Sequence, residues 1–174
     1  MESFLNPKKI LTQLDLRKNM VAVDFGSGSG GWAIPLAKIL KDGKVYATDI
    51  LEEPLSALRG KADIEGVTNI ETILTDVESE TGSKLKSKLA DIVLITNFLF
   101  QAKDKKLIFS EAKKILKNRG KILVVDWKTE TALGPKEKRI SPGEIKKIAK
   151  ELGLQIEKEF EASAYHWGLV LTGP

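Results

Sequence analysis

The stretch Val23 to Trp32, with the sequence VDFGSGSGGW, decides the fold because it places closely spaced glycines directly after an apolar run. The glycines that satisfy G-x-G-x-x-G, a pattern typical of dinucleotide binding, are Gly26, Gly28 and Gly31. Two features depart from that pattern. Asp24 stands two residues before the first glycine, and Gly30 is an additional glycine inside it. The stretch therefore raises the question of whether it binds a ligand and, if so, which one.

Around this stretch, short apolar runs alternate with helical patterns. Apolar residues recur at i, i+3, i+4 and i+7 from Ala33 to Leu40 and again from Ile145 to Leu152. Runs that are apolar on both faces and separated by helices predict an α/β fold, in which a mostly parallel sheet is covered on both sides. We also expect a short helix over Pro7–Leu16 to pack against this sheet. The candidate strands are residues 20–25, 44–50, 69–76, 90–97 and 120–127.

The end of the chain predicts a different connection. Leu154–Phe160 and Tyr165–Thr172 are strand-like runs, and the few residues between them leave no room for a helix, so this pair should form an antiparallel hairpin. A chain of 174 residues suits one ordinary domain. We predict a single domain over residues 1–174, with an N-terminal helical segment at 1–19 and the core at 20–174.

The composition excludes several classes of function. The apolar fraction of 42% and the charged fraction of 30% are typical of globular proteins. No apolar run reaches the roughly 18 residues of a membrane span, and the N-terminus lacks a secretory signal pattern, so we expect a cytoplasmic protein without a membrane span. The absence of cysteine excludes disulfides and thiolate catalysis, and a single histidine excludes a His-rich metal site. We therefore predict no metal.

The formal net charge of +4 includes lysine-rich runs such as KLKSK, KDKK and KKILKNRGK. Such runs could attract nucleic acid or an anionic substrate through a long-range field. The alternative is that they are solvated helix faces, which we favour because acidic residues are interleaved and no cluster of aromatic residues accompanies them.

The context of the glycine stretch gives it functional meaning. It lies between a predicted strand and a predicted helix, and ligands of open α/β sheets bind beyond the carboxyl ends of the strands. The alternative is that the glycines only shape a tight turn. A carboxylate at Asp24 would repel the pyrophosphate of a dinucleotide but would attract an ammonium group. The stretch thus favours a nucleoside cofactor that lacks phosphate and carries a positive charge.

At these residues the sequence resembles the class I S-adenosylmethionine-dependent methyltransferases, whose first motif is an acid-x-G-x-G-x-G loop. The resemblance spans about Val21 to Thr172, and the final YHWGLVLTG is similar to the end of small methyltransferases of ubiquinone and menaquinone biosynthesis. It implies a Rossmann-like three-layer sandwich with a seven-stranded sheet of order 3-2-1-4-5-7-6, in which strand 7 is antiparallel. S-adenosylmethionine would be the cofactor and S-adenosylhomocysteine the product. The matching positions are Asp24, Gly26, Gly28 and Gly30.

The resemblance also implies a cofactor site. Asp49 follows the glycines by about 20 residues at a strand end, where a carboxylate can accept both ribose hydroxyl protons; the alternative is a helix cap. Asp76 and Val77 would face the adenine, with helix capping again the alternative for Asp76. Trp32 packs either on the methionine end of the cofactor or in the core. The residues assigned to the cofactor are Asp24, Gly26, Ser27, Gly28, Gly30, Trp32, Asp49, Ile50, Asp76, Val77 and Asn97.

Catalytic residues are less constrained, because methyl transfer needs a base only when the attacking atom carries a proton. His166 and Asp126 are the candidates at the ligand edge, and a structural role is the alternative for His166. Asn97 and Phe98 do not spell N-P-P-[YF], which argues against a typical adenine or glutamine-amide methyltransferase.

Substrate contacts should come from the same edge, where residues 129–141 form a long loop before a helix that Ser141 caps. The alternatives are core packing for the aromatic residues and a surface ion pair for Arg139. The residues assigned to the substrate are Phe98, Phe100, Trp127 and Arg139.

The predicted function is methyl transfer from S-adenosylmethionine to an acceptor that the sequence does not identify, which is a small molecule, a protein or an RNA. Two alternatives stay open at this point: a non-catalytic module that binds S-adenosylmethionine, and a nicotinamide-dependent reductase. The oligomeric state also stays open.

Overall fold

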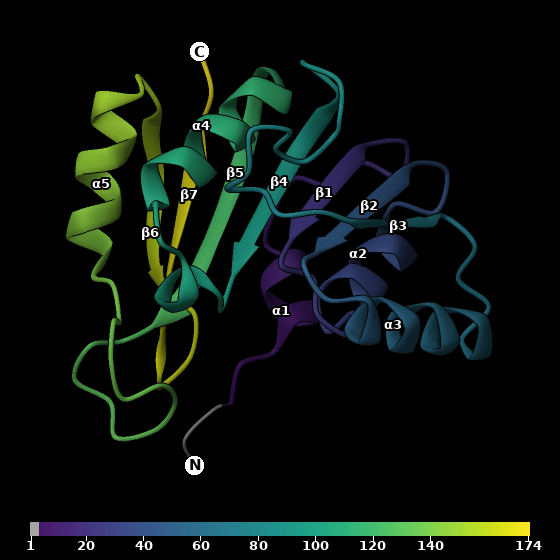
Figure 1. Ribbon diagram of the computed structural model, residues 1–174, viewed down its shortest axis with the longest axis horizontal. Coiled ribbons are helices and arrows are strands. Elements are labelled where there is room, and N and C mark those ends of the chain that lie inside the picture. Colours follow the sequence, from purple (N-terminus) through teal and green to yellow (C-terminus); the bar gives the residue numbers. More distant parts are fainter. Residues whose placement is uncertain (1–3) are drawn as a thin grey trace.

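Within residues 4–174, which the computed structural model describes, seven strands form one sheet in the order β3-β2-β1-β4-β5-β7-β6 (Figure 1). All neighbouring pairs are parallel except those that β7 makes with β5 and with β6. This order and the antiparallel last strand confirm the predicted fold. The strands are β1 (Val21–Phe25), β2 (Lys44–Asp49), β3 (Ile70–Leu74), β4 (Ala90–Thr96), β5 (Leu116–Trp127), β6 (Gln155–Glu161) and β7 (His166–Thr172).

Helices cover both faces of the sheet, as the alternation of patterns predicts. The first three helices bury one apolar cluster against one face, and the last two bury a second cluster against the other. The central strands β4 and β7 are buried almost throughout, which is why their sequences are continuously apolar. The helices are α1 (Pro7–Leu11), α2 (Ala33–Ile39), α3 (Glu52–Ile64), the 3₁₀ turn η1 (Leu99–Gln101), α4 (Lys105–Ile115) and α5 (Pro142–Glu151).

Two boundaries differ from the expectation. Helix α1 ends at Leu11 rather than Leu16, because the N–H groups of Gln13 and Leu14 bond carbonyls three residues back and tighten the chain into a turn. Strand β5 begins at Leu116, four residues before the predicted start, and its pairing with β4 shifts register between residues 116 and 121. The predicted division of the domain at residue 20 stays a prediction, and residues 1–3 of its first segment lie outside the described residues.

The start of α5 follows the predicted pattern. Ser141 accepts a hydrogen bond from the N–H of Glu144, and the Glu144 carboxylate accepts one from the N–H of Ser141, which forms a capping box. Pro142 follows in the first turn of the helix. These bonds fix the point at which the long loop after β5 ends.

Strand β6 forms one edge of the sheet and is almost wholly exposed. Only Phe160 among its seven residues is partly buried, and four of the seven are charged.

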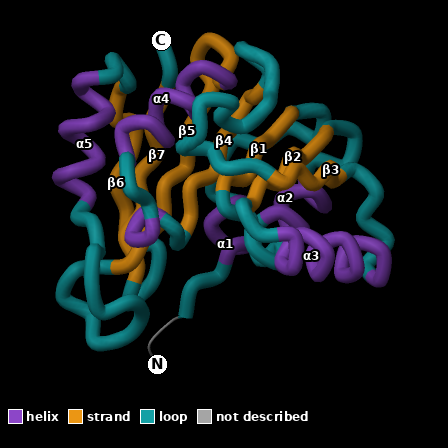
Figure 2. Tube along the Cα trace, viewed as in Figure 1, coloured by secondary structure: helices purple, strands orange, loops and turns teal. Residues whose placement is uncertain are grey.

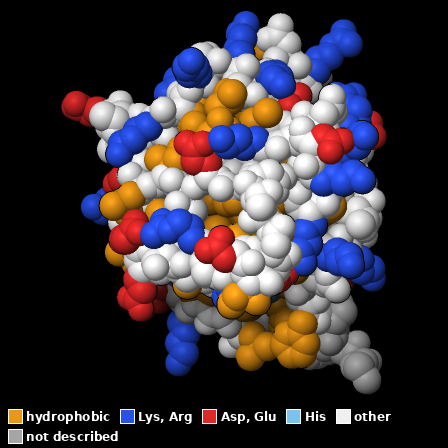
Figure 3. Space-filling view, turned by 90° about the vertical axis from the view of Figure 1, so that its right-hand side faces the viewer, with side chains coloured by type: hydrophobic (Ala, Val, Ile, Leu, Met, Phe, Trp, Pro, Cys, Tyr) orange, Lys and Arg blue, Asp and Glu red, His pale blue; other side chains and the backbone are white. Residues whose placement is uncertain are grey.

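The opposite side of the molecule, at the right of Figure 1, carries charges of both signs intermixed (Figure 3). No helix within residues 4–174 is long and apolar enough to span a membrane.

The carboxyl ends of the parallel strands meet at one edge of the sheet, at the bottom of Figure 1. Because β7 is antiparallel, its first residue, His166, lies at that same edge. The loop between β5 and α5 extends beyond this edge (Figure 2). The candidate site residues are therefore brought together by topology.

Candidate active site

A cavity of about 620 Å³ opens at the carboxyl edge, between the ends of β1 to β4 and the segment that joins η1 to α4. Its size lies within the range of roughly 300–1,000 Å³ that small-molecule sites occupy. The sequence-predicted residues that line it are Gly26, Gly28, Asp49, Ile50, Asp76, Val77, Asn97 and Phe98. Their binding roles stay predictions, but the structure brings them to one place.

The glycine turn leaves its inner side open to this cavity. Gly28 has a φ of +54°, and a Cβ built on it would meet nothing within 4 Å. Gly26 has a φ of +64°, and its Cβ would lie 3.0 Å from the Phe98 ring, so the turn packs flush against that side chain. A ligand can therefore approach the backbone closely at Gly28.

Asp24 lies beneath the turn, one residue before the end of β1, and pairs on either side with Ala47 and Leu94. Its side chain is fully buried, and within residues 4–174 neither carboxylate oxygen has a hydrogen-bond partner. Burial, and then the nearby charge of Asp49, raise the pKa of Asp24 to about 8. A buried carboxyl without a partner is costly. A positively charged donor is the group that would satisfy it.

Three further buried polar atoms lack partners among residues 4–174, and two of them, Ser27 Oγ and Asn97 Oδ1, belong to residues at the glycine turn or next to it. Asn97 follows β4, which pairs with β1, so it lies beside the glycine turn. It adopts a φ of +54°, and its N–H bonds the carbonyl of Val125 at 2.9 Å. Asn97 lines the cavity, whereas Asp24 and Ser27 lie beneath and within the glycine turn and do not line it. Together the three residues provide hydrogen-bond acceptors around the turn, a set that fits an ammonium group.

Asp49 ties the turn to the end of β2. Its Oδ2 accepts a hydrogen bond from the N–H of Gly28 at 2.9 Å, and its Oδ1 accepts one from the N–H of Leu51 at 3.1 Å. Helix α3 has Leu51 as its N-cap and no side-chain cap, so the capping role considered for Asp49 does not occur. Asp49 instead shapes the turn and faces the cavity.

Asp76 follows β3 and is exposed, whereas Val77 is buried. Residues 75–89 contain no helix, so Asp76 caps none. Its Oδ1 accepts a hydrogen bond from the N–H of Glu78 at 2.9 Å. Both residues thus line the cavity from a loop rather than from a helix start.

Asp126 is fully buried under η1. Its Oδ2 accepts a hydrogen bond from the N–H of Leu99 at 3.1 Å, and its Oδ1 accepts one from the N–H of Trp127 at 2.8 Å. Burial raises the pKa of Asp126 to about 6, although these two bonds oppose the rise. Both oxygens of Asp126 are therefore engaged by backbone N–H groups, and the carboxyl fixes the position of the turn that follows Asn97.

His166 is also buried. Its Nδ1 lies 2.9 Å from Ser163 Oγ, its ring packs at 4.1 Å between centroids on Trp127, and within residues 4–174 its Nε2 has no partner. Burial, and then the charge of Lys128, lower the pKa of His166 to about 4. The ring is neutral near pH 7, and Nε2 has no access to solvent.

Arg139 organises the loop between β5 and α5. Its guanidinium donates hydrogen bonds to carbonyl oxygens of five loop residues, and no carboxylate within residues 4–174 pairs with it. The surface ion pair considered as the alternative is therefore absent from this part of the chain. The guanidinium bonds the loop and does not line the 620 Å³ cavity, so the substrate contact assigned to Arg139 stays a prediction. The five residues are Lys128, Thr129, Thr131, Leu133 and Pro135.

Other predicted residues lie away from the 620 Å³ cavity. Trp32 is 7% exposed and packs in the apolar cluster of α1, α2 and α3. Gly30 packs on Leu58 and Ile34, where its Cβ would lie 2.9 and 3.2 Å from their carbons. Phe100 and Trp127 are half-buried and do not line the cavity.

Sequence reasoning missed several residues of the site. Thr48, one residue before the end of β2, and Thr75, directly after β3, line the cavity, and Leu51 and Leu107 add exposed apolar side chains. Trp167 donates its indole N–H to the carbonyls of Trp127 and Ile140, both at 3.1 Å, and so closes the base of the long loop. The strand ends could have identified the threonines, but no local pattern identifies the bond of an indole to a distant carbonyl.

A family model described as a methyltransferase domain matches residues 16–166. No curated protein matches the sequence. Among solved structures, an S-adenosylmethionine-dependent methyltransferase from Aquifex aeolicus is 24% identical with a TM-score of 0.87, covering 97% of this chain and 89% of that one. A protein assigned to the type 11 methyltransferases, from Sulfolobus solfataricus, is 27% identical with a TM-score of 0.79, covering 99% and 95%.

One protein of similar fold was solved with a ligand bound. Magnesium protoporphyrin IX methyltransferase from Synechocystis PCC 6803, solved with S-adenosylmethionine, is 19% identical with a TM-score of 0.74. The match covers 97% of this chain and 76% of that one. At this identity the comparison shows a shared fold, and the bound S-adenosylmethionine is the ligand of that protein.

Proposed function

This chain belongs to the methyltransferase domain family, and on that basis we propose that it transfers the methyl group of S-adenosylmethionine to an acceptor that approaches the carboxyl edge of the sheet beside Phe98. The observation that carries the proposal is the buried, unpaired carboxyl of Asp24 beneath an open glycine turn. An ammonium group on that turn would stabilise the ionised form of this buried carboxyl and satisfy it, whereas a phosphate would bring a negative charge with no cation to offset it.

In this proposal the chain holds the cofactor at three points. Asp24, Ser27 and Asn97 accept hydrogen bonds from the ammonium group, because their buried side-chain oxygens lack partners among residues 4–174 and lie around the glycine turn. Asp49 accepts from the ribose, and Asp76 with Val77 faces the adenine at the other end. Gly28 supplies the close backbone approach.

The cofactor supplies a methyl group on a sulfonium, whose carbon–sulfur bond breaks as a lone pair of the acceptor attacks the methyl carbon. The residues of this chain align the reactants and exclude water. Asp126 uses both oxygens on backbone N–H groups, and Nε2 of His166 is buried. The proposal therefore places no general base at the site, and it favours an acceptor whose attacking atom already carries a free lone pair at neutral pH.

The surroundings of the cavity are compatible with each of the acceptor classes considered. A single cavity of about 620 Å³ suits one small ligand, which leaves the acceptor to bind outside it. The open edge suits a protein or an RNA, and the loop that Arg139 organises could enclose a small molecule. We also propose a cytoplasmic location, which a chain without cysteine permits because it forms no disulfide.

The test is a transfer assay with methyl-labelled S-adenosylmethionine and a size-fractionated cell extract. We expect label in one fraction, which identifies the acceptor as small molecule, protein or RNA, and we expect the label to disappear with Asp24→Asn. A parallel titration compares S-adenosylhomocysteine with NADH. Binding of NADH alone, or binding of S-adenosylhomocysteine with no label in any fraction, would contradict the proposal.

A further inference from the structure

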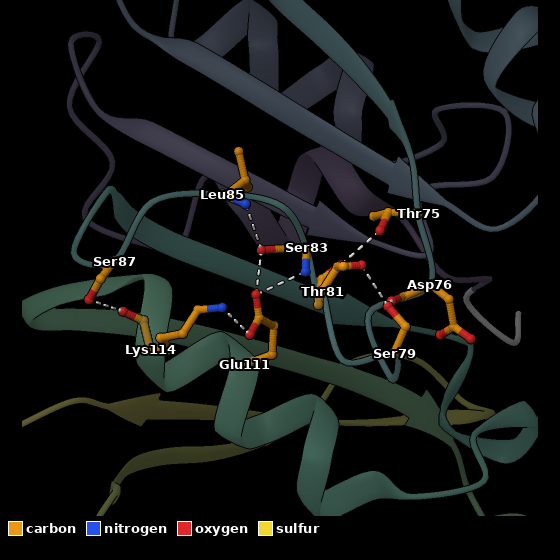
Figure 4. Close-up of polar contacts among 10 residues, drawn as sticks. Thr75, Asp76, Ser79, Thr81, Ser83, Leu85, Ser87, Glu111 and Lys114 are labelled. Atoms are coloured by element: carbon orange, nitrogen blue, oxygen red, sulfur yellow. Dashed lines mark hydrogen bonds and ion pairs between the residues drawn. The ribbon is translucent and has the colours of Figure 1, made fainter.

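The segment between β3 and β4 closes into a compact loop. The hydroxyl of Thr75 donates to the carbonyl of Gly82 at 2.7 Å and joins the two ends of residues 75–82 (Figure 4). Inside the loop, Ser79 donates through its N–H and its hydroxyl to the carbonyl of Asp76, at 3.0 and 2.6 Å. We call the two residues joined by the Thr75–Gly82 hydrogen bond the neck of the loop. The bonds of Ser79 hold Asp76 and Val77 at a fixed position relative to this neck.

The neck is anchored to α4 by one carboxylate. Glu111 Oε1 accepts hydrogen bonds from the N–H and the hydroxyl of Ser83, at 2.9 and 2.6 Å (Figure 4). Glu111 Oε2 pairs with Lys114 at 2.6 Å. The carboxylate is 8% exposed. Burial alone would raise the pKa of Glu111, but Lys114 and the two bonds from Ser83 outweigh burial and hold it below its ordinary value. The group is therefore ionised at neutral pH.

The neck fits against this carboxylate without spare room. Gly82 has a φ of +54°, and a Cβ built on it would lie 2.5 Å from the Glu111 carboxyl carbon. The position of the loop relative to the sheet is thus set by direct contact with Glu111.

We propose that Glu111 is a positioning residue for cofactor selectivity: without touching the cofactor, it places Asp76 so that the enzyme selects a 6-aminopurine over a 6-oxopurine. This inference rests on the proposed placement of the adenine beside Asp76 and Val77. A carboxylate accepts a hydrogen bond from a 6-amino group, whereas it meets a 6-oxo group as one acceptor facing another. A loop displaced from its anchor loses that discrimination.

The experiment compares the dissociation constants of S-adenosylhomocysteine and S-inosylhomocysteine by calorimetry. We expect the wild type to bind the adenosyl compound about tenfold more tightly or better, because the inosyl compound loses one hydrogen bond to a charged group. Glu111→Ala should reduce that preference by about threefold or more, because residues in one network are energetically coupled. In an Asp76→Asn background, Glu111→Ala should leave the remaining preference unchanged.

Controls separate positioning from stability. Ile145→Val, in the buried face of α5, lowers stability without touching the loop and should leave the preference intact. If Glu111→Ala does not fold, Glu111→Gln removes the charge, and Gly82→Ala keeps the carboxylate but displaces the neck. Either should reduce the preference.

The outcomes distinguish the two proposals. If Asp76→Asn leaves the preference at its wild-type value, the adenine placement is wrong, and the inference about Glu111 falls with it. If Asp76→Asn reduces the preference but the Glu111 and Gly82 variants weaken both ligands equally, Glu111 is only structural, and the proposed function stands.

Discussion

The two ends of the 620 Å³ cavity are built differently. At the loop end, Thr75, Ser79 and Ser83 all have hydrogen-bond partners within the protein, and Glu111 anchors them. At the glycine end, Asp24 beneath the turn and the half-buried Asn97 carry buried side-chain oxygens that have no partner among residues 4–174. One end is complete in the protein alone, and the other has unsatisfied acceptors.

This difference implies that the two ends of the cavity recognise a ligand in different ways, one by its shape and the other by its charge. The loop end is organised before any ligand binds, so it can select by fit at little ordering cost. The glycine end carries an unpaired carboxyl that destabilises the protein until a cation arrives. Most of the dependence of binding on charge should therefore lie at the glycine end.

The largest expected effect comes from Asp24→Asn. Removing the charge should weaken S-adenosylhomocysteine by about 100-fold, since loss of one partner of a buried charge pair costs several kcal/mol. Calorimetry measures it. The matched control is Asp91→Asn, near the start of β4 and away from the carboxyl edge, where the carboxylate pairs with Lys117. The affinity of this variant for S-adenosylhomocysteine should not change. Wild-type affinity in Asp24→Asn would remove the distinction between the two ends.

The second test uses two glycines of the same turn. Gly28→Ala places a methyl in open space, so it should lower stability by about 1 kcal/mol for the positive φ but weaken the ligand by roughly tenfold. Gly30→Ala collides with Leu58 at 2.9 Å, so it should lower stability by about 3 kcal/mol. Thermal unfolding with and without S-adenosylhomocysteine separates the two. Equal effects would show that the turn is structural throughout.

The smallest effect is a dependence of stability on pH. Because the pKa of Asp24 is raised to about 8 in the folded protein from an ordinary 3.8, the folded state binds more protons than the unfolded state between those values. The free energy of unfolding of the ligand-free protein should therefore fall as pH rises, by roughly 1 kcal/mol between pH 6 and 7, relative to Asp24→Asn. The unfolding midpoints of both proteins across this pH range measure the effect. If the free energies of unfolding of wild type and Asp24→Asn change with pH in the same way, Asp24 does not have the raised pKa.

The fold was predictable because its determinants are local and repeated. Apolar runs set β1, β2, β3, β4 and β7, and the short interval between residues 160 and 166 left only a hairpin. The end of α1 was wrong, since a 3₁₀ turn and a helical turn share the same apolar spacing there. The early start of β5 depends on pairing with β4 across a register shift, which no single segment encodes.

The candidate site was predictable where chemistry follows a strand end. Asp49, Asp76 and Asn97 were identified in this way, and all line the cavity. The surroundings of Arg139 were not predicted, because a guanidinium that gathers loop carbonyls looks in sequence like any surface cation. Glu111 was missed for a related reason: it lies in a helix 28 residues from Ser83, and only the tertiary structure joins them.

The charged edge strand β6 has a consequence for how copies of the protein meet. A neighbouring chain that added a strand beside β6 would have to desolvate the alternating carboxylates and ammonium groups of Glu157, Lys158 and Glu159. That penalty opposes growth into fibres from this side of the molecule. Concentrated solutions should therefore resist aggregation through this edge.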